Sequence, residues 1–110
     1  MADAIQVMTT TAAQADAKRV ARAVLEVHLA ACVQIIGPLT SLYWWQGEIE
    51  QAEEWLCLIK TRADAFADLE RAIRSVHPYE VPEIVALPVA AGSADYLAWL
   101  NGEVRRRTEK

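Results

Sequence analysis

The chain is poor in the residue types that build catalytic centres. It has two histidines, His28 and His77, and two cysteines, Cys32 and Cys57, among 110 residues. Nucleophilic catalysis needs a base within reach of a Ser, Cys or Thr and usually an orienting third group. Neither histidine lies beside a cysteine or in a nucleophile elbow, and the four glycines form no phosphate-cradling loop. The sequence therefore predicts a protein that is not an enzyme.

Positive charge and long apolar runs are also scarce. The formal net charge is -4 and the pI is near 5.1, which argues against a nucleic-acid partner because such binding needs clustered Lys and Arg. The basic run at 105–107 lies beside glutamates and is typical of a solvated tail. No stretch approaches the roughly 18 apolar residues of a membrane span, and the first ten residues lack a signal-peptide pattern. We therefore expect a cytoplasmic protein with no membrane partner and no required disulfide.

The length of the chain predicts a single domain over residues 1–110. Alternation predicts a first strand over 4–10, and apolar spacing predicts a helix over 12–31 with Thr11 as its N-cap. Residues 32–61 are rich in β-branched and aromatic types, which indicates two long strands joined near 46–50. Gly37 and Pro38 indicate a bulge or bend in the first of them.

The second half of the chain repeats the helix-then-strand order. A helix is predicted over 63–77 and ends before Pro78, a strand follows over 83–90, and Ser93 is a plausible N-cap for a short last helix. The order β-α-β-β-α-β plus a short C-terminal helix predicts an α+β, ferredoxin-like split βαβ fold. Its antiparallel sheet carries two helices on one face and leaves the other face bare.

The two long strands are predicted to be apolar on both sides. Leu42 and Trp44 fall on one face, and Tyr43 and Trp45 fall on the other. An arm of this kind exposed to water would be a sticky edge, so we expect other copies of the chain to cover it. Large aromatics on paired strands are typical of packing or interface anchors, and we assign Trp44, Trp45 and Trp55 to an interface.

Four segments in order, "LAACVQIIGPLTSLYWWQGEIE", "IKT", "HPYEVPEI" and "DYLAWL", closely resemble the CutA family of divalent-cation tolerance proteins. The resemblance implies a ferredoxin-like subunit, a tight homotrimer, cytoplasmic location and association with copper or other divalent ions. It also implies a likeness to the PII signalling proteins, which bind small effectors between subunits. The copper ligands proposed for the family are a first-strand cysteine and a histidine pair. Met8 and Val76 replace that cysteine and the first histidine here, and only His77 is kept.

The candidate metal ligands are His77, Cys32 and Glu80. His77 could join the soft sulfurs of Met8 and Cys32, which suit Cu(I), or Glu80 and Glu83, which suit harder ions. The structural alternatives are a His77 that bonds the orphan carbonyls at the end of its helix and a Cys32 that is a buried thiol.

The candidate effector cleft between subunits comprises Gln34, Lys60, Tyr79 and Glu83, an assignment that rests partly on the family resemblance. The structural alternative is a Lys60–Glu83 ion pair that fixes the register of the trimer. Two function hypotheses follow: a non-enzymatic homotrimer of divalent-metal tolerance, or a PII-like sensor whose clefts accept a small anionic or zwitterionic effector.

Overall fold

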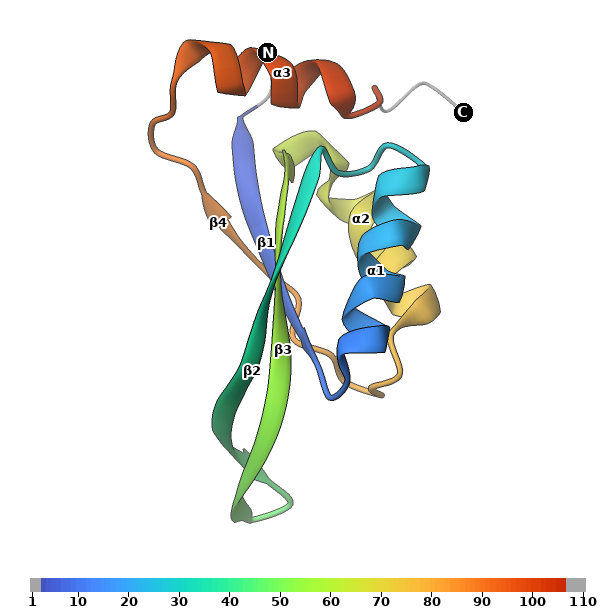
Figure 1. Ribbon diagram of the computed structural model, residues 1–110, viewed down its shortest axis with the longest axis vertical. Helices are drawn as coiled ribbons and strands as arrows, with labels where there is room; N and C mark the ends of the chain where they lie inside the picture. The colour runs from blue at the N-terminus through green and yellow to red at the C-terminus, as the bar shows by residue number, and fades with distance from the viewer. Residues whose placement is uncertain (1–2, 107–110) are drawn as a thin grey trace.

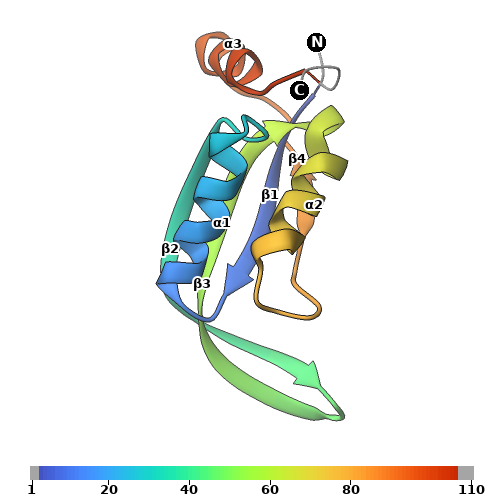
Figure 2. The same cartoon turned by 90° about the vertical axis from the view of Figure 1, so that its right-hand side faces the viewer.

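The computed structural model describes residues 3–106 (Figure 1). The sheet has the order β2-β3-β1-β4, with every neighbouring pair antiparallel. Helices α1 and α2 cover one face of the sheet, and α3 crosses its end (Figures 1 and 2). The elements are β1 (Ala4–Thr11), α1 (Gln14–Glu26), β2 (Cys32–Trp45), β3 (Glu48–Arg62), a 3-10 turn (Ala63–Ala65), α2 (Phe66–Val76), β4 (Val85–Pro88) and α3 (Ala94–Glu103). The predicted α+β split βαβ fold is confirmed.

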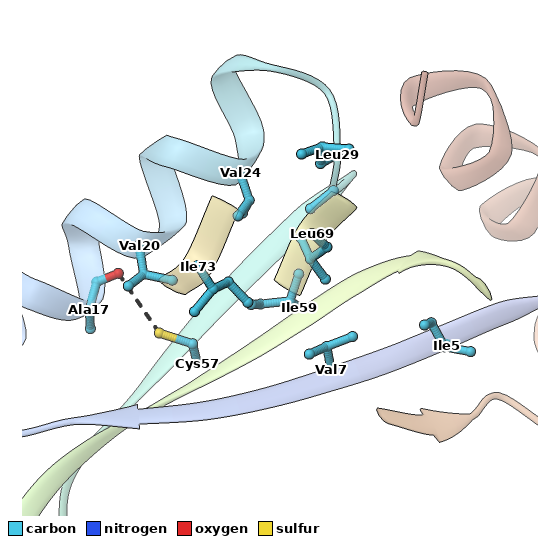
Figure 3. Close-up of a cluster of buried hydrophobic side chains, with 11 residues drawn as sticks. Ile5, Val7, Ala17, Val20, Val24, Leu29, Cys57, Ile59, Leu69 and Ile73 are labelled. Carbon is cyan, nitrogen blue, oxygen red and sulfur yellow. Dashed lines mark hydrogen bonds between the residues drawn. The ribbon is translucent and has the colours of Figure 1, made fainter. Parts of the chain in front are cut away.

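The core lies between the two helices and the sheet (Figure 3). Helix α1 contributes Ala17, Val20 and Val24, whose spacing of three and four residues places them on one stripe. Helix α2 contributes Leu69 and Ile73 in the same way. These side chains pack against strand residues such as Val7 and Ile59. Burying each large aliphatic side chain contributes roughly 1.5–3 kcal/mol, so this layer holds both helices on the sheet.

The start of α1 differs from the prediction. Thr11 is the last residue of β1, paired with Trp55 of β3, and its hydroxyl donates to the carbonyl of Ala13 at 2.8 Å. The N-cap is Ala13, without a side-chain cap. The strand continues to Thr11 because the ladder with β3 and burial in the core outweigh the capping preference. The helix also ends at Glu26, short of the predicted residue 31, and His28 follows with a left-handed φ of 58°.

Strands β2 and β3 form an arm that extends past the helices (Figure 1). The turn at Gln46 and Gly47 has φ of 51° and 84°, and two positive φ values are typical of the tight hairpin turn that suits twisted strands. The ladder shifts register between Ile36 and Leu39, so the bulge predicted at Gly37 and Pro38 is confirmed.

Helix α3 begins and ends on identifiable polar contacts. Ser93 Oγ accepts from the Tyr96 N–H, as the capping prediction required. At the other end, the buried Arg62 guanidinium donates to the carbonyls of Asn101, Val104 and Arg105. Arg62 therefore fastens the C-terminal turn of α3 to the end of β3. Within residues 3–106, no helix combines the length and apolar character needed to cross a membrane.

Candidate functional site

His77 lies at the exit of α2 with both ring nitrogens engaged. Its Nδ1 accepts from the Tyr79 N–H at 3.1 Å, so the ring proton is on Nε2, which donates to the Thr10 carbonyl at 2.8 Å. The side chain is buried, with 8% exposure. This neutral imidazole links the 77–79 segment to β1, and it has no free lone pair for a metal. His77 is therefore structural within one subunit, but its ring bonds Thr10 of β1 and not, as predicted, the last carbonyls of α2.

The predicted metal ligands are not gathered in one subunit. Cys32 is paired in register with Lys60, whereas Thr10, the partner of His77, is paired with Leu56. Four residues along β3 separate these two rows, which is about 13 Å of strand. In the described ranges, no group of three His, Cys, Asp or Glu side chains lies close enough to hold an ion. A copper site made of His77, Cys32 and Glu80 does not fit a single subunit.

The predicted cleft residues also fall into two places. The Lys60 ammonium donates to the Gln34 side-chain carbonyl. Tyr79 and Glu83 line a groove elsewhere. The Lys60–Glu83 ion pair is not formed within the part of the chain that is described. Any site that used all four residues would need more than one subunit.

The groove at Tyr79 lies between the loop after α2 and the arm, and has a volume of about 850 Å³. The Tyr79 hydroxyl donates to Glu54 Oε2 at 2.6 Å. Burial and then the Glu54 contact raise the pKa of Tyr79 above its ordinary value, so this hydroxyl keeps its proton. Tyr43, Trp45, Glu50, Glu80 and Glu83 also line the groove.

Sequence reasoning missed Glu50 and Glu54. The alternation of side chains along the arm could have identified them. Tyr43 pairs in register with Glu50, and Trp45 and Glu54 lie on the same face of the arm as this pair. The groove therefore combines aromatic and acidic side chains on one side of the arm. Its four carboxylates face no Lys, Arg or His among the lining residues.

The three tryptophans assigned to an interface lie in different settings. Trp44 and Trp45 have 72% and 48% exposure and project from opposite faces of the arm. Trp55 is half-buried and packs against the main core cluster. Within one subunit, Trp55 thus contributes to the core, while the other two are left exposed.

The sheet face opposite the helices is largely apolar. Register places Val85, Met8, Leu58 and Gln34 in one row on this face, and Leu87, Gln6, Lys60 and Cys32 in the next. Val85 and Leu87 are exposed, and helices α1 and α2 lie on the other side of the sheet (Figure 2). Tyr96 of α3 reaches Cys32, and its pKa is raised by desolvation and by that contact. Cys32 and Lys60 therefore occupy a surface that the described elements leave mostly uncovered.

Residues 5–103 match the family model described as CutA1 divalent ion tolerance protein. The divalent-cation tolerance protein CutA of Thermus thermophilus is 48% identical over 95 residues, covering 86% of this chain and 92% of that protein. Protein CutA of Mus musculus is 51% identical over 85 residues, which cover 77% of this chain but only 48% of the mouse protein.

Solved structures agree with these sequence matches. The divalent cation tolerance protein structure from Thermus thermophilus superposes with a TM-score of 0.91 at 44% identity, covering 93% of this chain and 99% of that one. CutA1 from Oryza sativa superposes with a TM-score of 0.91 at 36% identity, covering 94% and 95%.

Proposed function

Because this chain belongs to the CutA1 family of divalent ion tolerance proteins, we propose that it serves divalent-cation tolerance as a homotrimer that binds rather than catalyses. Copper or a similar ion would be held weakly where subunits meet. The observation that carries this proposal is the position of the Cys32 thiol on the sheet face that helices α1 and α2 leave uncovered, where only Tyr96 of α3 is described beside it. A neighbouring subunit seated there would supply further donors, which residues 3–106 of one subunit do not bring together.

Self-assembly is supported by the amount of apolar surface on the arm and the open face. Leu42, Trp44 and Ile49 share one side of the arm and are more than half exposed. Contiguous exposed apolar surface of this kind marks an interaction site on a soluble protein. Burying it against sister chains is favourable by roughly 25 cal/mol per Å² of apolar area.

Light scattering and copper titration test the proposal together. At micromolar concentration, the mass should be three times the 12.2 kDa of one chain. Calorimetric titration should show copper binding that Cys32→Ser weakens. Ser75→Ala, an exposed change on α2, is the control and should leave the titration unchanged. A well-folded 12 kDa particle, or no heat with copper, zinc or nickel, would overturn the proposal.

A second candidate function is a PII-like sensor of a small anionic or zwitterionic effector. It is favoured by Lys60, whose ammonium is bonded to the neutral amide of Gln34 and has no carboxylate partner among residues 3–106. A metabolite thermal-shift screen should find a ligand that raises the melting temperature by mass action. Lys60→Gln should abolish that shift, and Lys18→Gln on the exposed side of α1 should not.

Cytoplasmic location stays part of this proposal. It is the expectation from the sequence, whereas a similar structure from Archaeoglobus fulgidus is described as periplasmic. Fractionation of cells that express the tagged full chain would test it. Recovery outside the cytoplasmic fraction would overturn this part alone.

A further inference from the structure

Two charged side chains on the open sheet face lack a partner of opposite sign. Glu54 is 7% exposed, and the Tyr79 hydroxyl fills one of its acceptor positions. Lys60 is half-buried and donates to the neutral amide of Gln34. Neither charge takes part in a salt bridge within residues 3–106. A copy of the chain seated on this face would remove the remaining water from both charges, which is costly unless each is paired.

The two charges cannot meet within one subunit. Glu54 and Lys60 lie on the same side of β3, away from α1 and α2, because an even number of residues separates them. Six residues of strand correspond to about 20 Å, which exceeds the combined reach of the two side chains. A pair between them must therefore join two copies of the chain.

The groove at Tyr79 has the lining that a lysine side chain needs. Glu54 faces it, and the rings of Tyr43 and Trp45 lie along its arm side. Aromatic rings suit contact with the methylene stem of a lysine and with its ammonium group. The described lining contains no Lys, Arg or His, so the cation that pairs with Glu54 must come from outside the groove.

The positions of the other cations leave Lys60 as the candidate. Several already have carboxylate partners: Arg19, Arg22, Arg62, Arg71 and Arg74. The others in residues 3–106 lie on α1 or follow α3, away from the open face: Lys18, Arg105 and Arg106. Glu54 is favoured over Glu83 as the acceptor because Glu83 is exposed and can keep its water.

We propose that Lys60 of one copy enters the Tyr79 groove of the next copy and donates to Glu54 there. The inference rests on the proposed homotrimer and names the contact that fixes its register. In a closed ring each copy gives one Lys60 and receives one, so no charge is left unpaired. An ammonium has three donors, so the bond to Gln34 can persist. The same ammonium is then occupied and does not hold an effector.

The first test is a double-variant cycle on the full chain without metal, with mass followed by light scattering through a dilution series. Lys60→Met and Glu54→Gln should each raise the concentration of half-dissociation about tenfold or more, because each leaves one buried charge unpaired. The double variant should lose much less than the product of the two single losses. Glu53→Gln removes a charge from the other side of β3 and should leave the midpoint unchanged.

The second test exchanges the two charges. Lys60→Glu should prevent assembly, because two carboxylates would then meet at every contact between copies. Adding Glu54→Lys in the same chain should restore assembly, whereas adding Glu83→Lys should not. Circular dichroism of each variant shows whether it folds. If Glu54→Lys fails to fold, the neutral cycle of Lys60→Met and Glu54→Gln decides.

Independent losses in the neutral cycle, or rescue by Glu83→Lys in place of Glu54→Lys, would overturn the Lys60–Glu54 contact. An unchanged midpoint in Lys60→Met would do the same. A wild-type chain that scatters as a monomer would overturn the homotrimer and this contact together. A wild-type trimer whose dissociation ignores both substitutions would overturn the contact alone, so the two failures are distinguishable.

Discussion

Beside the apolar contacts of Leu100 and Val104, the attachment of α3 should depend on one polar side chain, Arg62. Its side chain is 8% exposed, and its guanidinium donates to Val104 O at 2.7 Å, Arg105 O at 2.9 Å and Asn101 O at 3.0 Å. Arginine at a helix C-terminus satisfies the last carbonyls and complements the helix dipole. Arg62→Leu removes these donors and leaves the carbonyls without partners.

The cost of Arg62→Leu follows from those contacts. A hydrogen bond to a charged group contributes about 1.5–3 kcal/mol when buried. The bond to Val104 is buried, while those to Asn101 and Arg105 are partly buried and regain water when α3 loosens. We therefore expect a loss of about 3 kcal/mol in the free energy of unfolding, together with faster amide exchange in α3.

Urea unfolding at one fixed protein concentration would measure this loss, since the proposed self-assembly would make stability concentration-dependent. Arg71→Leu is the matched control. Its side chain is 70% exposed and forms an i,i+3 pair with Asp68 on α2, so it should cost less than about 0.5 kcal/mol. Equal costs for the two variants would refute the assignment of Arg62 as the fastening of α3.

Three further predictions concern the sheet. Thr9→Val should raise the free energy of unfolding by about 1 kcal/mol in urea titration, because the Thr9 hydroxyl is buried without a partner among the described residues; a loss would contradict this. Burial raises the pKa of Cys57 to about 11. The unfolded chain releases that proton first, so stability should fall as pH rises from about 9 to about 11, and Cys57→Ala should flatten that part of a pH series of melting temperatures. Gly37→Ala should cost about 1–3 kcal/mol by thermal melting, since the new Cβ would lie 2.5 Å from the Trp55 ring, and an unchanged melting temperature would show that the ring moves freely.

The elements could be predicted because their signals are local. The apolar stripe of α2 and the proline after it define that helix, and the cap at Ser93 depends on one side chain. The predicted start of α1 was wrong because Thr11 belongs to β1. Its partner in the ladder, Trp55, lies 44 positions further along the chain. No local pattern reports such a pairing.

The candidate site was harder to predict for the same reason. Chain order could place His77 at a helix exit, but not show that Thr10 and Tyr79 occupy its two nitrogens. The sequence does not distinguish Glu54 from an exposed glutamate, because its burial results from contact with Tyr79 in the loop after α2. Its role depends on contacts between the loop and the arm, which sequence periodicity does not contain.

The tight turn at Gln46 and Gly47 has a consequence for how the arm can change in evolution. Because the ladder continues to Trp45 and Glu48, adding two residues to each strand would lengthen the arm by about 7 Å and keep every existing side chain on its side. Adding one residue to each strand would place the side chains beyond the insertion on the opposite face of the arm. The length of the arm should therefore vary among related chains in steps of two residues per strand, which preserve both of its faces.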